Sequence, residues 1–190
     1  MIPLPSLAYS PCYWNTAAAC SEGRREDGLL GRETFGNREK MKAHFVEYGS
    51  LEWKAARTLR HSMFYKDLGL PESIMDDDQE VKGSHLVALN SGKVIGYGRL
   101  NDVGDGNFHI SQVVVSPDCQ GKGIGSMLLD CLIERASSIG ARSVWLSARL
   151  SASSFYERVG FRQEGEVFTS EKTGVPYIRM RLTIKNDIIK

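Results

Sequence analysis

The sequence predicts an α+β domain with a mixed, mostly antiparallel sheet of about seven strands. Three observations indicate this class. Short apolar runs with strand character dominate the chain, two glycine-containing turns join three of these runs into a meander, and helical segments fall on the connections between strands. The expected order of elements is β-α-β-β-β-α-β-α-β-β, without an internal repeat.

The first strand and helix follow Met41, where organised sequence begins. Residues 42–48 alternate well enough for a short strand. A helix is expected over 50–68, where the hydroxyl of Ser50 can cap its start and Gly69 can end it. An apolar stripe with a spacing of four residues should face the sheet. Its members are Leu51, Ala55, Leu59 and Met63.

The predicted meander follows a polar, acidic loop over 71–83. A turn with the sequence NSGK joins its first two runs and is typical of a hairpin. A second turn, GDGN, leads into the third run. The three expected strands cover 84–90, 94–100 and 108–115.

The second half of the chain contains the clearest helix. Apolar residues with helical spacing run from Ile124 to Ile139, and Gly140 stops the pattern. The remaining elements are a strand over 142–148, a short helix over 151–159 and two final strands over 161–168 and 175–184.

Composition restricts the function. A chain of 190 residues is long enough for one domain with a sizeable core. Its 24 basic and 23 acidic side chains leave a net charge of +1, so no global field would attract nucleic acid or an anionic membrane. No apolar run approaches the ~20 residues of a membrane helix. We therefore expect neither nucleic acid nor a membrane as a partner.

The four cysteines form no CxxC pair and no Cys/His cluster with metal-ligand spacing. This pattern favours a reduced, cytoplasmic protein without a metal site. The cysteines are Cys12, Cys20, Cys119 and Cys131.

Residues 1–40 differ from the rest of the chain. They show neither strand nor helix periodicity, and they lack the basic start and apolar core of a signal peptide. We predict a disordered N-terminal extension over 1–40, a folded domain over 41–184 and a short tail over 185–190.

A loop with three alternating glycines, SPDCQGKGIGSMLLD (116–130), connects the apolar run HISQVVV to the clearest helix. The sequence matches neither the P-loop nor the dinucleotide-binding fingerprint. Glycines nevertheless let backbone N–H groups approach a ligand closely, and a helix start adds free N–H groups and a positive dipole end. The loop therefore indicates either a phosphate site or a turn that needs glycine only for its geometry.

The segment VVVSPDCQGKGIG with its following helix resembles the acyl-CoA signature of the GNAT superfamily of N-acetyltransferases. Gln120, Gly123 and Gly125 fill the positions of that signature. A second segment, ASSFYERVGF, is similar to another motif of the family. The resemblance covers about residues 42–184, and within the superfamily it is nearest to small bacterial-type proteins of undefined substrate. The matching residues of the second motif are Ala152, Phe155, Tyr156, Gly160 and Phe161.

The resemblance implies a GNAT fold whose fourth and fifth strands splay apart, with helices on both faces, and it implies acetyl-CoA as co-substrate without a metal. The pantetheine arm would pair with the backbone of the fourth strand, and the pyrophosphate would lie on the N–H groups of residues 121–126. The cofactor-binding residues expected on this basis are Val113, Val114, Val115, Gln120, Gly121, Lys122, Gly123, Ile124, Gly125 and Ser126.

Tyr156 is the catalytic residue that the resemblance implies. An amine would attack the acetyl group directly, and a phenol with a pKa near 10 could protonate the departing thiolate. The alternative is a purely structural role, in which the tyrosine packs beside Phe155. The acceptor would be a small-molecule or peptide amine, and a homodimer is left open.

The general base is not identified by the sequence. His109 and the acids of the 67–80 loop are candidates, although a histidine on a strand is more often structural. The acidic run at 76–80 is either an attraction for a cationic acceptor or a solvated loop. Arg149 stands where many relatives have an asparagine that contacts the cofactor, so that contact is in doubt.

Two other functions remain open at this point. One is a non-catalytic module that binds CoA as a sensor or scaffold, and an intact Tyr156 argues mildly against it. The other is a nucleotide-binding protein that uses the glycine loop.

Overall fold

The computed structural model describes residues 12–13 and 41–184. The predicted tail over 185–190 and the predicted extension, apart from Cys12–Tyr13, lie outside the described residues. The strands are β1 (Cys12–Tyr13), β2 (Lys42–Val46), β3 (Ser84–Asn90), β4 (Lys93–Asp102), β5 (Asn107–Val115), β6 (Ser143–Arg149), β7 (Arg162–Thr169) and β8 (Pro176–Thr183). The α-helices are α1 (Leu51–Phe64), α2 (Asp78–Lys82), α3 (Ile124–Ser138) and α4 (Ser153–Arg158). Short 3-10 helices span Lys66–Leu68, Glu72–Met75, Pro117–Cys119 and Leu150–Ala152.

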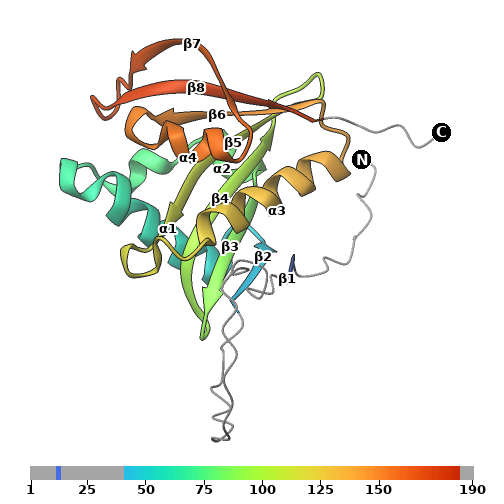
Figure 1. Ribbon diagram of the computed structural model, residues 1–190. Coiled ribbons are helices and arrows are strands. Elements are labelled where there is room, and N and C mark those ends of the chain that lie inside the picture. The colour runs from blue at the N-terminus through green and yellow to red at the C-terminus, as the bar shows by residue number, and fades with distance from the viewer. Residues whose placement is uncertain (1–11, 14–40, 185–190) are drawn as a thin grey trace, which may run out of the picture.

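The described strands form one mixed sheet in the order β1-β2-β3-β4-β5-β6-β8-β7 (Figure 1). Neighbours pair antiparallel except β5 and β6, which are parallel. The predicted α+β class and the antiparallel meander are confirmed, and the last two strands, β7 and β8, pair antiparallel. The two-residue strand β1, which pairs with β2, adds an eighth strand to the seven expected.

The two faces of the sheet are covered by different helices, with α3 in front of the sheet and α1 behind it in Figure 1. Successive residues of β4 point to opposite faces, as the two-residue period of a strand requires. Gly96 and Gly98 lie under α3, where an added Cβ would meet Leu128 and Leu132, whereas Tyr97 is buried with Ala56 of α1. The larger core lies on the α3 side.

The stripe predicted for α1 is wrong at Leu51 and Ala55, which are exposed, whereas Leu59 and Met63 are partly buried and pack against the core on this face. Leu51 is 81% exposed, and the buried residues of this helix are Trp53, Ala56 and Arg60. The inward face therefore carries an arginine, which a search for apolar periodicity counts as polar. The helix also ends at Phe64, earlier than expected, and a separate 3-10 turn continues to Gly69, which adopts a left-handed backbone with φ 67°.

The acidic segment predicted as a loop over 71–83 is partly helical. It forms a 3-10 turn and then α2, whose first N–H groups are capped by the side chain of Asp77. The carboxylate of Asp77 accepts from the backbone N–H of Glu80, whose side chain is buried with only 2% exposed. The solvated-loop interpretation is therefore wrong for Glu80.

The divergence of β5 from β6 confirms the expected splay. The two strands pair only where Asn107–His109 lie beside Ser143–Trp145. Beyond that point β5 bends through a bulge opposite Tyr97–Arg99, and Gln112 within the bulge takes a left-handed backbone with φ 55°. The side of β5 that faces β6 is therefore left without a strand partner over its second half.

Substituting Gly98 with valine should lower the free energy of unfolding by about 1–3 kcal/mol. A Cβ at this position would lie 2.7 Å from Cδ1 of the fully buried Leu132. Chemical denaturation measures the cost. In a Leu132→Ala background the same substitution should cost at least about 1 kcal/mol less, because the clash is removed. An equal cost in both backgrounds would contradict this account of the β4–α3 contact.

Candidate active site

The glycine loop leaves β5 through a tight turn. The backbone N–H of Cys119 donates to the carbonyl of Ser116, and Nε2 of Gln120 donates to the carbonyl of Val115 at 3.0 Å. Gly121 and Gly123 then take left-handed backbones, with φ 73° and 79°, and an added Cβ would meet nothing within 4 Å at either position. The loop is thus held to the end of β5 by hydrogen bonds, and Gly121 and Gly123 border open space.

The start of α3 lies directly behind this loop. Gly123 is its N-cap residue, no side chain caps the helix, and no acidic residue occupies its first turn. The first N–H groups of a helix have no partner within it, and the helix dipole is positive there. An anion such as a phosphate is therefore the natural partner of this end.

A pocket of about 510 Å³, here called the loop pocket, opens between the glycine loop, β5 and α4. Lys122 is the one predicted cofactor residue that does not line it, and its Nζ donates instead to the carbonyl of Asp118 at 2.9 Å. Arg158 of α4, which no motif of the sequence indicated, also lines the pocket. The other nine predicted residues all line it: Val113, Val114, Val115, Gln120, Gly121, Gly123, Ile124, Gly125 and Ser126.

A second pocket of about 340 Å³, here called the cleft pocket, lies where β5 and β6 diverge. Phe64 and Tyr65 at the end of α1, His109 on β5 and Tyr177 on β8 contribute aromatic side chains to its lining. Val113, Ala152 and Tyr156 line both pockets. The two pockets therefore meet at Tyr156.

Tyr156 belongs to α4 and is held by aromatic contacts. Its ring lies 5.0 Å from that of Phe155 and 6.1 Å from that of Phe161, both in edge-on geometry. Burial, with a smaller effect of the Tyr177 hydroxyl, raises the pKa of Tyr156 to about 12. The residue is thus a packed aromatic side chain, as the structural alternative expected, and also a phenol that stays protonated at neutral pH.

His109 lines the cleft pocket and stacks on Trp145, with ring centroids 3.9 Å apart. Burial, and then the positive charges of Arg99 and Arg179, lower the pKa of His109 to about 4. The imidazole is therefore neutral at pH 7, but it is a much weaker proton acceptor than an ordinary histidine. The lining of the cleft pocket contains no carboxylate from the described residues.

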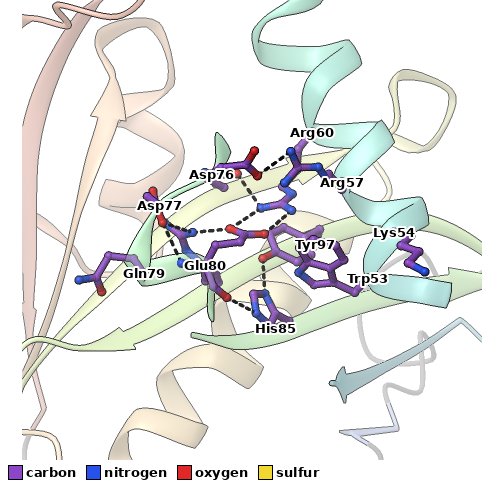
Figure 2. A network of polar contacts seen from close by, with 12 residues as sticks. Trp53, Lys54, Arg57, Arg60, Asp76, Asp77, Gln79, Glu80, His85 and Tyr97 are labelled. Atoms are coloured by element: carbon purple, nitrogen blue, oxygen red, sulfur yellow. Dashed lines mark hydrogen bonds and ion pairs between the residues drawn. The ribbon is translucent and has the colours of Figure 1, made fainter. Parts of the chain in front are cut away.

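Asp76, Asp77 and Glu80 of the 67–80 segment are engaged outside the cleft pocket. The carboxylate of Asp76 pairs with Arg57 at 2.8 Å, and Asp77 caps α2. Glu80 accepts hydrogen bonds from Arg60 at 2.5 and 3.0 Å and from Arg99, and Asp77 lies 3.3 Å from Arg99 (Figure 2). The four residues Arg60, Asp77, Glu80 and Arg99 are called the ion cluster below.

The ion cluster reaches the active site through β5. Nη1 of Arg60 donates to the side-chain oxygen of Gln112 at 2.9 Å, and Nε of Arg99 donates to the hydroxyl of Ser111 at 3.1 Å. Ser111 and Gln112 line the cleft pocket, and Gln112 is the left-handed residue of the bulge. The cluster thus fixes the segment of β5 at which the two strands part.

Electrostatics keeps Glu80 ionised. Burial alone would raise the pKa of this carboxyl, but the hydrogen bond and charge of Arg60 and the charge of Arg99 outweigh it and hold the pKa below its usual value. The stability that Glu80 contributes is therefore present above its unfolded-state pKa and is lost as the pH falls through the lowered folded-state value.

His85 and Tyr97 complete the polar network beneath the cluster (Figure 2). Nε2 of His85 lies 2.9 Å from the carbonyl oxygen of Glu80, and Nδ1 lies 2.6 Å from the hydroxyl of Tyr97. Because a carbonyl only accepts, Nε2 carries the proton and Nδ1 accepts from the tyrosine. Burial lowers the pKa of His85, which favours this neutral form.

Neither a metal-binding group nor a membrane-spanning helix is present in the described part of the chain. Within residues 12–13 and 41–184, no three His, Cys, Asp or Glu side chains converge in a group that could hold a metal ion. No helix in the same part of the chain has the length and apolar character that a membrane crossing requires.

Comparison with solved structures defines the class of protein first. An acyl-CoA N-acyltransferase of Pseudomonas aeruginosa is similar with a TM-score of 0.64 at 26% identity, over 75% of this chain and 99% of that one. An aminoglycoside 6′-N-acetyltransferase complexed with coenzyme A shares the fold alone, with a TM-score of 0.58 at 13% identity, over 74% of this chain and 96% of that one. The fold is that of an acyltransferase.

Sequence comparison then gives the family. The model of the acetyltransferase (GNAT) family matches residues 51–161, more than half of the chain, and the chain belongs to this family. An uncharacterised N-acetyltransferase of Bacillus subtilis, YjcF, is 27% identical over 127 residues, which cover 67% of this chain and 89% of the relative. The resemblance drawn from the two sequence motifs is confirmed, and the protein is an acyltransferase by family.

Arg60→Met should lower the free energy of unfolding by about 3–5 kcal/mol, because it leaves the buried Glu80 with only part of its charge compensation. Arg57→Met is the matched control, one turn earlier on α1. The partners of Arg57, Glu72 and Asp76, are 50% and 62% exposed, so its loss should cost less than about 1 kcal/mol. Urea denaturation of both variants gives the comparison, and equal costs would refute the importance of the ion cluster.

Proposed function

We propose that the protein transfers an acetyl group from acetyl-CoA to a primary amine by direct attack, with Tyr156 as the general acid. The observation that carries this proposal is the position of Tyr156 in the lining of both pockets. A donor in one pocket and an acceptor in the other would meet beside its hydroxyl.

The loop pocket suits the donor. The open glycines and the uncapped start of α3 offer backbone N–H groups to a pyrophosphate, and the exposed Arg158 adds a positive charge at the same pocket. The unpaired side of β5 at Val113, Val114 and Val115 offers backbone groups to an amide-bearing arm. The side chains of Val114 and Ile124 are buried, so their contribution comes from the backbone.

Acetyl-CoA would supply an activated acyl group with a thiolate as leaving group. The amine nitrogen forms a bond to the carbonyl carbon, the carbon–sulfur bond breaks, and the sulfur takes the phenolic proton of Tyr156. One proton from the attacking nitrogen is released to solvent, and Tyr156 is reprotonated from water. Burial keeps this phenol protonated at neutral pH, so that a proton is available when a thiolate forms beside it.

No side chain of the cleft pocket is proposed as a strong base. His109, the candidate within this pocket, accepts a proton poorly because its pKa lies at about 4. The same burial and positive charges would lower the pKa of a bound ammonium group, so that the amine gives its proton to water more readily.

Gly123→Val should abolish most of the rise in melting temperature that CoA or acetyl-CoA causes. A valine side chain would occupy the open space from which a phosphate approaches the backbone. Gly140→Val is the matched control, because Gly140 also has a positive φ of 86° and no neighbour within 4 Å, but lies at the other end of α3. It should lose stability without losing the CoA-induced shift. A folded Gly123→Val variant that binds CoA normally would exclude the glycine loop as the phosphate site.

Tyr156→Phe should lower turnover by roughly 10²-fold while the affinity for acetyl-CoA changes little. The substitution removes one hydroxyl and keeps the ring contacts with Phe155 and Phe161. Release of CoA measures turnover, and calorimetry measures affinity. Equal turnover in the two proteins with an identified acceptor would remove Tyr156 from the mechanism. Binding of CoA without turnover of any amine would favour the sensor or scaffold module.

A further inference from the structure

The charge of the cleft pocket is unusual for a site that receives an amine. Of the described side chains that line it, Arg149 alone is charged at pH 7, since His109 is neutral. None of the described carboxylates lines the pocket, and Asp76, Asp77 and Glu80 of the neighbouring segment pair with arginines. The pocket therefore offers no counter-charge to an acceptor with several ammonium groups.

Arg149 itself has no anionic partner within the described part of the chain. Its guanidinium lies over the ring of Phe64, 5.2 Å from the centroid, and forms no hydrogen bond or ion pair with a described residue. Its Nε is buried without an acceptor. A buried N–H without an acceptor costs free energy, and a bound ligand could supply the acceptor.

A second polar group of the same pocket is also unsatisfied. The hydroxyl of Thr173, in the turn between β7 and β8, is buried and has no hydrogen-bond partner. Arg149 comes from the end of β6 and Thr173 from the β7–β8 turn, so two separate elements bring unused donors to one pocket. An oxyanion accepts hydrogen bonds from both kinds of group.

Size and wall chemistry limit the ligand further. A volume of about 340 Å³ lies near the lower end of small-molecule sites, which span about 300–1,000 Å³. Phe64, Tyr65 and Tyr177 give the pocket aromatic walls. A small molecule with an apolar part fits this lining better than an extended polar one.

We propose that the acceptor is a small amine that also carries an oxyanion, as an amino acid does, and that Arg149 binds this oxyanion. The proposal rests on the proposed function, because it assigns the substrate class of the same site. It excludes polyamines and aminoglycosides as preferred acceptors, even though an aminoglycoside acetyltransferase shares the fold. Arg149 is then a specificity-determining residue for the acceptor, not a contact of the donor.

The electrostatic field of the pocket agrees with this assignment. The positive charges of Arg99 and Arg179, after burial, lower the pKa of His109, and Arg149 adds a further positive charge to the same pocket. A positive field attracts the oxyanion end of such a molecule and disfavours the protonated form of its amine end. The same positive field would thus favour both binding of the oxyanion and deprotonation of the amine.

Matched acceptor pairs test the proposal, since the members of each pair share a carbon skeleton and a primary amine, and one of the two carries an oxyanion. L-Phenylalanine is compared with L-phenylalaninamide, and 2-aminoethyl phosphate with 2-aminoethanol, while spermidine is the cationic comparison. CoA release should give a kcat/KM about 10- to 100-fold higher for the anionic member of at least one pair, because a hydrogen-bonded charge pair is lost in the neutral member. The pair that shows the larger preference identifies the oxyanion as a carboxylate or a phosphate.

Variants at position 149 separate this role from a structural one. Arg149→Gln should bring the two members of the favoured pair to within about threefold, chiefly by raising KM for the anionic amine, and should leave KM for acetyl-CoA unchanged. Arg149→Lys should restore part of the preference because it keeps the charge. In the presence of CoA, the anionic amine should raise the melting temperature of the wild type but not that of Arg149→Gln.

Three results would overturn the proposal. The first is a wild-type preference for spermidine or for the neutral members of both pairs. The second is an Arg149→Gln variant that changes KM for acetyl-CoA but keeps the preference. The third is the absence of both turnover and thermal shift with every anionic amine. The proposed acetyl transfer is tested separately, by loss of CoA binding in Gly123→Val and loss of turnover in Tyr156→Phe. If both losses are found, acetyl transfer is supported even when the acceptor proposal fails.

Discussion

The buried ion pairs around Glu80 are the constraint on which the centre of the molecule depends. They join α1, α2 and β4 through Arg60, Glu80 and Arg99, and they continue by hydrogen bonds into Ser111 and Gln112 of β5. Buried ion pairs usually stabilise a fold no more than apolar side chains of the same volume would, since both charges lose their hydration. Their contribution here is to position the backbone: they fix the bulge of β5, and therefore the point at which β5 diverges from β6.

The site follows from that parting of strands. A continuous sheet would use the second half of β5 for pairing and would leave no space between its neighbours. Because β6 turns away after Trp145, one side of β5 borders the loop pocket and the cleft pocket, and α4 brings Tyr156 to the place where they join. The glycine loop and the start of α3 then complete the loop pocket at the end of the same strand.

Local patterns in the sequence predicted much of this arrangement. The meander, the apolar face of α3 and the glycine loop depend on residues close together in the chain, where periodicity and motif spacing are informative. Tyr156 was indicated by the resemblance to the family. The ion cluster was missed because its partners are distant: Arg60 and Glu80 are 20 residues apart, and Arg99 and Glu80 are 19 apart. An arginine counted as polar moved the predicted face of α1, and a buried glutamate within an acidic run was read as solvated. The roles proposed for Arg158 and Arg149 could not be predicted, because they depend on the pockets that these residues line.

The two pockets have only Val113, Ala152 and Tyr156 in common, and this limited overlap bears on the kinetics of the proposed reaction. In the proposed reaction each substrate would occupy a pocket of its own beside Tyr156, so that neither would have to arrive before the other. Initial-rate plots against both substrates would then show intersecting lines, as for a ternary complex with random order of addition. The acylated product and the free thiol would likewise leave independently, and a slow exit of one would not hold back the other.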